Sequence, residues 1–370
     1  MRINPRLKIV IAAAMLVTMP SACGLGAGED TSPRAIRSAY EQGDFGRAQS
    51  LIAAAFETED VGGETRLLAG LNDLAIGNGI GAENHLRIAQ RMGIAADSIT
   101  PLLAEALARQ GKIEAAKSLA VKSGNTAILA IVDGIAAQSA DQPWQAREAF
   151  ERAYRLIPQN RRLAIDLAAM RAQLGLFDEA LQLATMVSAA QPRNIRARNM
   201  AGDIHLRLRE YPAAEAAYDK ALIIQPENVA ALTGKARAMY GQKKWAAAEK
   251  LLTALPGDLA IREDVQLLRG KIAARQRRHD EARTLFADAG DNLFGDDEAM
   301  FLAAQGFTRE GQYWKAIRLL EASVRARPDL PEYHADLIRA YRAAGDNAAA
   351  AARLAAVPPD LKNAPELQGL

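Results

Sequence analysis

The chain has 370 residues, enough for two or three ordinary domains or for one long array of repeats. Its 46 basic and 44 acidic residues give a net charge of +2, which excludes a strong global attraction to nucleic acid. Hydrophobic residues make up 49% of the chain but aromatic residues only 5%, so much of the apolar content is alanine, which favours helix. No long run of valine, isoleucine or threonine alternates with polar residues, and β-strands are therefore not expected.

Residues 1–22 are predicted to be a secretory signal peptide. Arg2, Arg6 and Lys8 form a basic start, and residues 9–19 form an apolar run that is too short to span a bilayer as a helix. Removing these three basic residues with the signal leaves 43 basic and 44 acidic residues, a net charge of −1. No later stretch is long and apolar enough to cross a membrane.

Cys23 directly follows the signal and is the only cysteine, so an intrachain disulfide is excluded. The sequence around it resembles the lipobox of bacterial lipoproteins, although Pro20 stands where that family usually has leucine. The resemblance implies that Cys23 becomes the lipidated first residue and that residues 23–28 tether it to the first repeat. By the same resemblance, Gly24 favours the outer membrane, where the protein would face the periplasm. The alternative is an ordinary signal peptide cut nearby, which would leave a soluble periplasmic protein.

A regular repeat runs through most of the chain, and its period is the interval from Pro158 to Pro192 and again to Pro226. Ala214, Tyr218 and Ala221 lie on one face of a predicted helix, because their spacing is i, i+4 and i+7. Three series of residues recur with this period: alanines at Ala146, Ala180, Ala214, Ala248, Ala282, Ala316 and Ala350; small residues at Gly134, Ala168, Gly202, Ala236, Gly270 and Ala304; and prolines at Pro158, Pro192, Pro226 and Pro328, with gaps at Ala260 and Phe294.

These series resemble the signature of the tetratricopeptide repeat (TPR) family, in which the same pattern recurs about every 34 residues. The resemblance implies an all-α fold, a right-handed α-solenoid of about ten tandem helix-turn-helix repeats. Seven repeats are expected in residues 127–364, three divergent ones in residues 29–126, and a short tail in residues 365–370. The third repeat is about four residues short, and Pro256 with Gly257 predicts a second irregular point. One helix pair cannot bury its apolar face alone, so stability should depend on stacking between neighbours.

No pattern of catalytic or metal-binding residues stands out. The four histidines lie in separate repeats without a nearby cysteine, and no Gly-x-Ser-x-Gly motif occurs. The glycine-rich segment 77–81 lacks the strand and the Gly-Lys-Ser/Thr of a phosphate loop, and we expect a turn between helices there. The acidic segments 59–60 and 296–298 are expected to cap helices. We therefore expect no cofactor, no metal and no enzymatic activity.

In TPR proteins the first helix of each repeat lines a concave surface, and partners usually bind there. The resemblance assigns five positions of each repeat to this surface, and an extended or helical peptide with apolar anchors and acidic groups would complement it. In the C-terminal repeats these positions are mostly basic or polar: Arg162, Arg196, Asn199, Arg207, Arg237, Tyr240, Lys271, Arg275, Arg309, Arg339 and Arg342, with acids at Asp203, Asp264, Glu298 and Glu332. In the second and fourth repeats they are apolar: Leu67, Leu71, Leu74, Ile128, Ile131 and Ile135. Alternatively, the arginines are solvated or paired with acids on neighbouring helices.

The leading hypothesis is a periplasmic scaffold, anchored in the outer membrane, that binds protein partners in the assembly of an envelope machine. It resembles the TPR lipoproteins of tight-adherence (Flp) and type IV pilus assembly, which help secretin or pilus components to assemble. A second hypothesis is the TPR scaffold of an exopolysaccharide synthesis and export complex, because a basic groove would suit an anionic polymer. An enzyme would need a catalytic domain, for which the repeats leave no room. The identity of the partner and the oligomeric state stay open.

Overall fold

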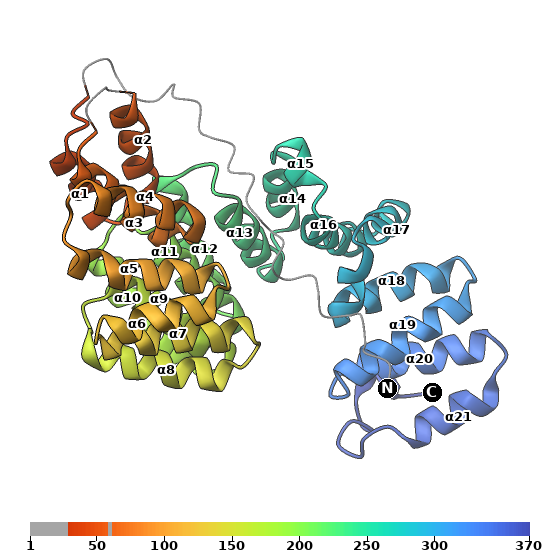
Figure 1. Cartoon of the computed structure of the whole chain (residues 1–370). Coiled ribbons are helices and arrows are strands. Elements are labelled where there is room, and N and C mark those ends of the chain that lie inside the picture. The colour runs from red at the N-terminus through yellow and green to blue at the C-terminus, as the bar shows by residue number, and fades with distance from the viewer. Residues whose placement is uncertain (1–28, 58–60) are drawn as a thin grey trace. The chain divides into compact units, whose positions relative to one another are not determined.

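The computed structural model describes residues 29–57 and 61–370, and all the regular structure in these ranges is helical (Figure 1). The prediction of an all-α fold is confirmed. None of the helices in the described ranges is long and apolar enough to cross a membrane. The predicted signal peptide, Cys23 with its tether, and the acidic pair Glu59 and Asp60 lie outside the described residues.

The chain divides into two compact units, residues 1–200 and 201–370. The described part of the first unit consists of helical hairpins in chain order: α1 (Pro33–Glu41) with α2 (Phe45–Phe56), α3 (Gly63–Ile76) with α4 (Gly79–Arg91), α5 (Ala96–Arg109) with α6 (Ile113–Lys122), α7 (Thr126–Ser139) with α8 (Pro143–Leu156), and α9 (Arg161–Gln173) with α10 (Phe177–Ala190). Helix α11 (Ile195–Arg207) crosses the division between the units.

The second unit continues the same arrangement after α11. Its helices are α12 (Tyr211–Ile224), α13 (Val229–Gly241) with α14 (Trp245–Thr253), α16 (Glu263–Arg275) with α17 (His279–Asp288), α18 (Asp297–Arg309) with α19 (Tyr313–Ala326), and α20 (Pro331–Ala343) with α21 (Asn347–Ala355). Three short elements are added to this series: α15 (Gly257–Ala260), and the 3-10 helices η1 (Gly290–Gly295) and η2 (Pro365–Leu367).

Each hairpin turns at one residue whose backbone is left-handed, with φ between 55° and 86°. Glycine occupies six of these ten turn positions in the described chain, because it adopts a positive φ without steric strain. The positions are Gly43, Gly77, Gly111, Asp141, Gly175, Arg209, Lys243, Arg277, Gly311 and Gly345. Their spacing follows the repeat period except between Gly111 and Asp141, which lie closer together in the sequence because helix α6 is short.

Small residues on the first helix of a hairpin pack against large residues on the second. Gly134 lies against Phe150, Gly202 against Tyr218, and Gly270 against Phe286; a Cβ atom on any of these glycines would approach the ring closer than 3.0 Å. The alanine series predicted from the sequence is buried, since none of its seven members exposes more than 4% of its surface. The fold therefore depends on side-chain size at each helix contact.

The second unit has two interruptions. Helix α14 ends at Thr253 and α15 follows at Gly257, as the Pro256-Gly257 pair predicts. The second is η1, which ends just before Asp296, the residue that caps the N-terminus of α18 through its carboxylate. Both interruptions lie where the proline series has its gaps, at Ala260 and Phe294, and the second could have been predicted from that signal.

Candidate functional site

In the first unit, the concave arginine Arg162 is part of a buried network of ion pairs. Arg162 donates to Glu105 at 2.9 Å, and Arg109 donates to Glu105 at 2.9 Å and to Asp166 at 2.7 Å. Arg162 also donates to the hydroxyl of Tyr40 at 2.8 Å. The side chain of Glu105 is only 3% exposed and that of Arg162 only 13%. Arg162 is therefore paired with Glu105 of α5 and largely buried, although it also lines a small pocket of about 200 Å³.

The members of this network stabilise one another in their charged forms. Burial alone would raise the pKa of Glu105, but the guanidinium groups of Arg162 and Arg109 outweigh burial and hold the pKa at about 2. Burial would likewise lower the pKa of each arginine, yet the carboxylates raise it. All of these side chains stay charged at neutral pH, and their charges compensate one another.

Arg196 was predicted to be a second cation of the open groove, and the structure assigns it partners within the first unit. Its guanidinium donates to the carbonyl oxygen of Ala75 at 2.8 Å and to the carboxylate of Asp166 at 3.4 Å. Its side chain is 41% exposed, so it is less buried than Arg162. In the first unit Arg162 and Arg196 thus have acidic partners, which agrees with the alternative that the arginines are paired with acids on neighbouring helices.

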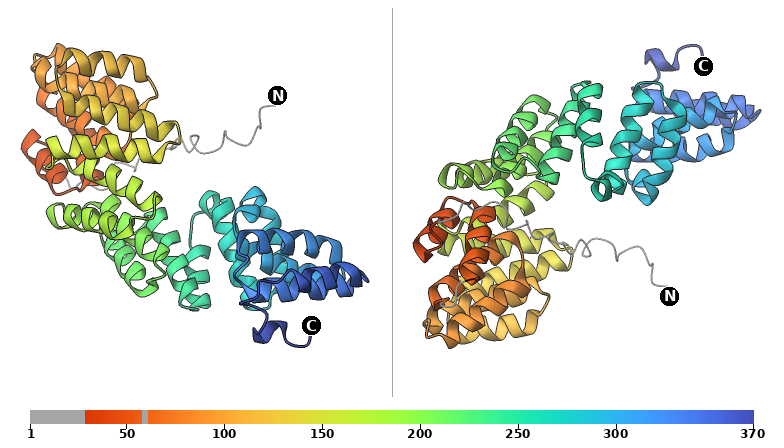
Figure 2. Two further views of the ribbon diagram at one scale, coloured as in Figure 1. Left: turned by 90° about the horizontal axis from the view of Figure 1, so that it is seen from below. Right: turned by 90° about the horizontal axis from the view of Figure 1, so that it is seen from above.

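The start of the first unit also lies beside its end (Figure 2). The amide of Arg193 donates to the carbonyl of Gln42 at 3.0 Å, and its guanidinium pairs with Asp44. The side-chain amide of Gln191 donates to the carbonyl of Tyr40 at 3.3 Å. These contacts join segments of the first unit that are far apart in the sequence, and they border the small pocket that Tyr40, Arg162 and Arg196 line.

The predicted apolar groove is mostly interior. Leu74, Ile131 and Ile135 expose 4% of their surface or less, and Ile128 exposes 7%. Only Leu67 and Leu71 are half-buried, and they pack against core clusters of neighbouring hairpins. The four buried residues stabilise the stack and are not available to a partner, which corrects the prediction of an apolar partner surface for them.

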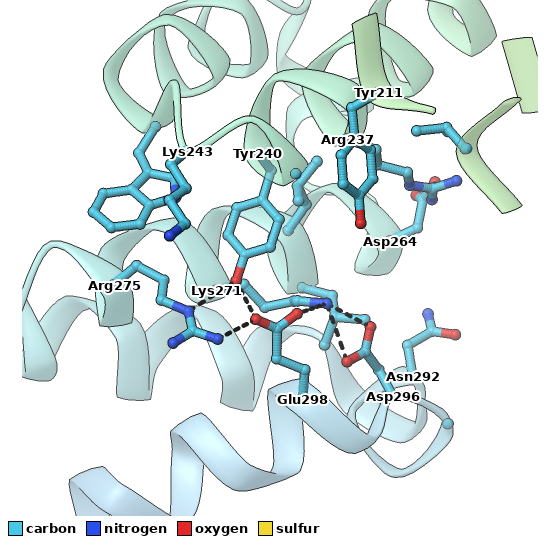
Figure 3. Close-up of a pocket in the computed structure, with 16 residues that line it drawn as sticks. Tyr211, Arg237, Tyr240, Lys243, Asp264, Lys271, Arg275, Asn292, Asp296 and Glu298 are labelled. Carbon is cyan, nitrogen blue, oxygen red and sulfur yellow. Dashed lines mark hydrogen bonds and ion pairs between the residues drawn. The ribbon is translucent and has the colours of Figure 1, made fainter. Parts of the chain in front are cut away.

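The second unit contains a pocket of about 900 Å³, which we call the second-unit pocket (Figure 3). Four of the predicted groove residues line it: Arg237 and Tyr240 from α13, and Lys271 and Arg275 from α16. The rest of its lining comes from the same and adjacent elements: Leu206, Tyr211, Gly241, Lys243, Trp245, Asp264, Leu267, Leu268, Asn292, Gly295, Asp296 and Glu298. Four positions assigned from the repeat pattern thus converge here, whereas in the first unit two of them, Arg162 and Arg196, share a smaller pocket of about 200 Å³.

Glu298 contacts three other polar side chains that line the pocket. Its carboxylate accepts hydrogen bonds from the hydroxyl of Tyr240 at 2.7 Å and from Lys271 at 2.9 Å, and it also pairs with Arg275 (Figure 3). The ammonium group of Lys271 binds Asp296 as well, at 2.9 Å, and its side chain is only 13% exposed. Lys271 therefore ties α16 to the N-terminus of α18.

These contacts shift the titration of the groups involved. Burial alone would raise the pKa of Glu298, but the charge of Lys271 and the hydrogen bonds from Arg275 and Tyr240 hold it at about 2. Burial and the adjacent carboxylate of Glu298 raise the pKa of Tyr240. Burial would lower the pKa of Lys271, but Glu298 and Asp296 outweigh it and raise the pKa.

The wall opposite Glu298 is more open. Arg237 lies 3.6 Å from Asp264 and keeps 48% of its side chain exposed. Lys243 is exposed, and among the residues that the structure describes it has no ion-pair partner. Tyr211 and Trp245 add aromatic surface. Sequence reasoning missed Lys243, Trp245 and Tyr211, because Lys243 lies in a hairpin turn and the two aromatic residues begin second helices, outside the assigned positions of the first helices.

The remaining predicted residues do not line this pocket. Asn199 and Arg207 lie on α11, and Arg309 is exposed at the end of α18. Arg339 pairs with Asp336 and donates to the carbonyl of Glu366, and Arg342 is exposed near the end of α20. In the described ranges no cluster of three or more histidine, cysteine or acidic side chains could hold a metal ion.

Acid should lower the free energy of unfolding of the second unit, because Glu298 becomes protonated. A carboxylate whose pKa is lower in the folded than in the unfolded state stabilises the fold above its unfolded pKa, near 4.5, and loses that contribution as the pH falls towards 2. We expect Glu298→Gln to cost at most roughly 3 kcal/mol at pH 7 and almost nothing near pH 2. Unfolding of both proteins by urea, measured across this range, tests the prediction. A difference in stability that stays constant with pH would contradict it.

The comparisons with known proteins agree with this architecture. Residues 205–272 and 307–370 match the family model described as tetratricopeptide repeat. Among solved structures, a chain of the Cut9–Hcn1 hetero-tetramer of the APC/C is similar, with a TM-score of 0.62 and 14% identity over 79% of this chain. This chain covers 59% of that one. The matched residues make up about a third of the chain, and the likeness to this structure shows the fold, a helical solenoid of the TPR type.

Other TPR structures are similar over shorter or less well superimposed regions. A tetratricopeptide repeat protein from Parabacteroides merdae is 16% identical over 76% of this chain and 98% of its own, with a TM-score of 0.42. YrrB, described as a TPR protein with an unusual peptide-binding site, is 19% identical over 50% of this chain and 95% of its own, with a TM-score of 0.36. No curated protein matches the sequence. Stacked helical repeats of this type form extended concave surfaces, which such proteins use for binding.

Proposed function

We propose that this protein is a scaffold that binds a segment of a partner protein in the second-unit pocket. The observation that carries the proposal is the convergence of concave residues from α13, α16 and α18 on one pocket of about 900 Å³. That volume accommodates several side chains of a peptide. In contrast, the basic concave residues of the first unit are bound to its own acids.

The chemistry of the pocket suits a polypeptide. Tyr211, Tyr240 and Trp245 offer rigid aromatic surface, the kind of surface that is enriched at protein interfaces. Lys243 and Arg237 offer cations with exposed side chains, while Asp264, Asp296 and Glu298 are paired with cations of the pocket. The lining therefore presents both signs of charge together with aromatic surface, a mixture that suits a polypeptide better than a uniformly anionic polymer. We therefore favour a protein partner over an exopolysaccharide.

We further propose that the scaffold works at the outer membrane and faces the periplasm. The basis is the signal-like segment 1–22 followed by Cys23, and its resemblance to lipoprotein signals. In this proposal the lipid on Cys23 holds the repeats near an envelope machine of the pilus or secretion type, and the pocket captures one of its components during assembly.

A photo-reactive amino acid at Asn292, an exposed residue of the pocket rim, tests partner binding in the full-length protein expressed in its native cells. We expect an adduct that mass spectrometry maps to one segment of one envelope protein. Gly295→Phe should abolish the adduct, because Gly295 lines the pocket and the added ring would occupy it. The fold should tolerate the change, since a Cβ at Gly295 meets nothing within 4 Å. Gly257→Phe, the same change at an open position outside the pocket, should leave it. An adduct that persists in Gly295→Phe would refute the pocket as the site.

Cys23→Ser tests the anchor separately. We expect the parent protein to fractionate with outer membranes and to incorporate a labelled fatty acid, and the variant to do neither. If the parent is found in the soluble periplasmic fraction and carries no label, the anchor is absent and the partner site is unaffected.

A further inference from the structure

Three successive hairpin turns of the second unit carry a basic residue at the left-handed position. These residues are Arg209, Lys243 and Arg277, with φ of 59°, 61° and 64°. The same position is glycine in six of the other seven hairpins and aspartate in the remaining one, Asp141. Left-handed backbone is strained for side chains such as arginine and lysine, whereas glycine adopts it freely and aspartate tolerates it better. Arginine and lysine therefore fit the left-handed backbone of these turns less well than glycine does.

The three side chains also lack ion-pair partners. Each is exposed, and within residues 29–57 and 61–370 none of them lies within ion-pair distance of a carboxylate. The charge of Arg209 does reach Asp329, whose pKa is lowered first by a hydrogen bond from Arg327 and further by Arg209. The neighbouring cations behave differently: Lys244 pairs with Glu215 at 3.0 Å, and Arg278 pairs with Glu249. Strained residues that persist without a structural role are concentrated at functional sites.

The repeat places these three charges on one side of the unit. Turns at the same position of successive repeats lie along one edge of a stack of hairpins. Lys243 also lines the second-unit pocket, so the row of charges adjoins it. We call Arg209, Lys243 and Arg277 the basic edge.

We propose that the basic edge binds an acidic stretch of the same partner chain that occupies the second-unit pocket. This inference rests on the proposed function. An extended polypeptide can enter the pocket and continue along the edge, and its acidic side chains would neutralise the three cations. A membrane surface could meet the edge but not the pocket, and a uniformly anionic glycan would make no use of the aromatic surface of Tyr211, Tyr240 and Trp245 inside the pocket.

The turn geometry allows a test that separates charge from folding. Replacing all three residues by glycine (Arg209→Gly, Lys243→Gly and Arg277→Gly) removes the cations and relieves the strain, so the Tm should stay the same or rise. The probe is a fluorescent oligoglutamate peptide at low salt, with an oligoglutamine peptide as its neutral counterpart. We expect the triple variant to lose about tenfold or more in affinity for oligoglutamate, and its binding to depend less on salt.

Two matched substitutions complete the test. Asp141→Gly makes the corresponding change in the first unit, and oligoglutamate binding should be unchanged. Gly311→Lys extends the basic edge by one turn, at a position where a Cβ meets nothing within 4 Å, and should strengthen binding even though it strains the backbone.

The results also distinguish this inference from the proposed function. If the triple variant binds oligoglutamate as the parent does, the basic edge is not a binding surface. If phosphatidylglycerol vesicles or a sulfated glycan bind the edge more tightly than the peptide, the inference of a polypeptide is overturned. If the adduct at Asn292 forms with full yield in the triple variant, the pocket function stands and the edge proposal fails alone.

Discussion

Glu105→Ala is expected to destabilise the first unit by about 3–5 kcal/mol, because it leaves two buried arginines without their shared carboxylate. Arg109 and Arg162 each expose only 13% of their side chains, so solvent cannot replace the lost charge. Asp166 would still pair with Arg109, but Arg162 would keep only neutral partners such as Tyr40. Thermal and urea unfolding followed by circular dichroism measure the loss.

Asp133→Ala is the matched control in the same unit. Asp133 pairs with Lys117 at 3.4 Å and with Arg152 at 3.8 Å, but its side chain is 35% exposed. Exposed pairs of this kind contribute roughly 1 kcal/mol or less. Equal losses from the two substitutions would contradict the view that the buried network stabilises the first unit. A small loss from Glu105→Ala alone would do so as well.

Gly234→Ala is expected to destabilise the second unit by about 2 kcal/mol or more, a large effect for one methyl group. A Cβ at Gly234 would approach the ring of Tyr218 closer than 3.0 Å. The ring cannot move away, because Gly202 of α11 lies equally close on another side and Asp203 accepts a hydrogen bond from the Tyr218 hydroxyl at 2.6 Å. The added methyl must therefore separate α12 from α13.

Gly306→Ala provides the control for this prediction. Gly306 lies inside α18, and a Cβ there meets nothing within 4 Å. Alanine favours helix over glycine, so we expect unchanged or higher stability, by up to about 1 kcal/mol. Combining Gly234→Ala with Tyr218→Leu should recover part of the loss, since a smaller side chain makes room. Equal effects of the two glycine substitutions, or strictly additive ones in the double variant, would refute the packing argument.

The two units use the concave positions of their repeats differently. In the first unit, Arg162 and Arg196 turn inward to Glu105 and Asp166, and the α1–α2 turn contacts the segment before α11. In the second unit, Glu298 holds Tyr240, Lys271 and Arg275 in fixed positions but leaves a pocket beside them. A partner would therefore meet a preformed site in the second unit, with little side-chain entropy left to lose on binding.

Part of this site could be predicted from the sequence. Arg237, Tyr240, Lys271 and Arg275 were assigned to the concave surface by their position in the repeat, and the pocket brings all four together. The prediction of an apolar partner surface was wrong for the buried positions, because the sequence period is the same for a side chain that faces a partner and for one that packs against the next hairpin. Leu74 and Ile131 are buried by their neighbours, and only the packed stack reveals that.

The sequence by itself determined the helices, the hairpin turns and the burial of the alanine series, because these depend on residues close in the chain or one repeat away. The missing prolines at Ala260 and Phe294 even marked the two interruptions. The tertiary structure decided which cations are paired, since Arg162 meets Glu105 57 residues away and Tyr40 122 residues away. It also decided which turn residues adjoin the pocket. Such contacts depend on how the repeats curve in space, and a repeating pattern carries no record of that curvature.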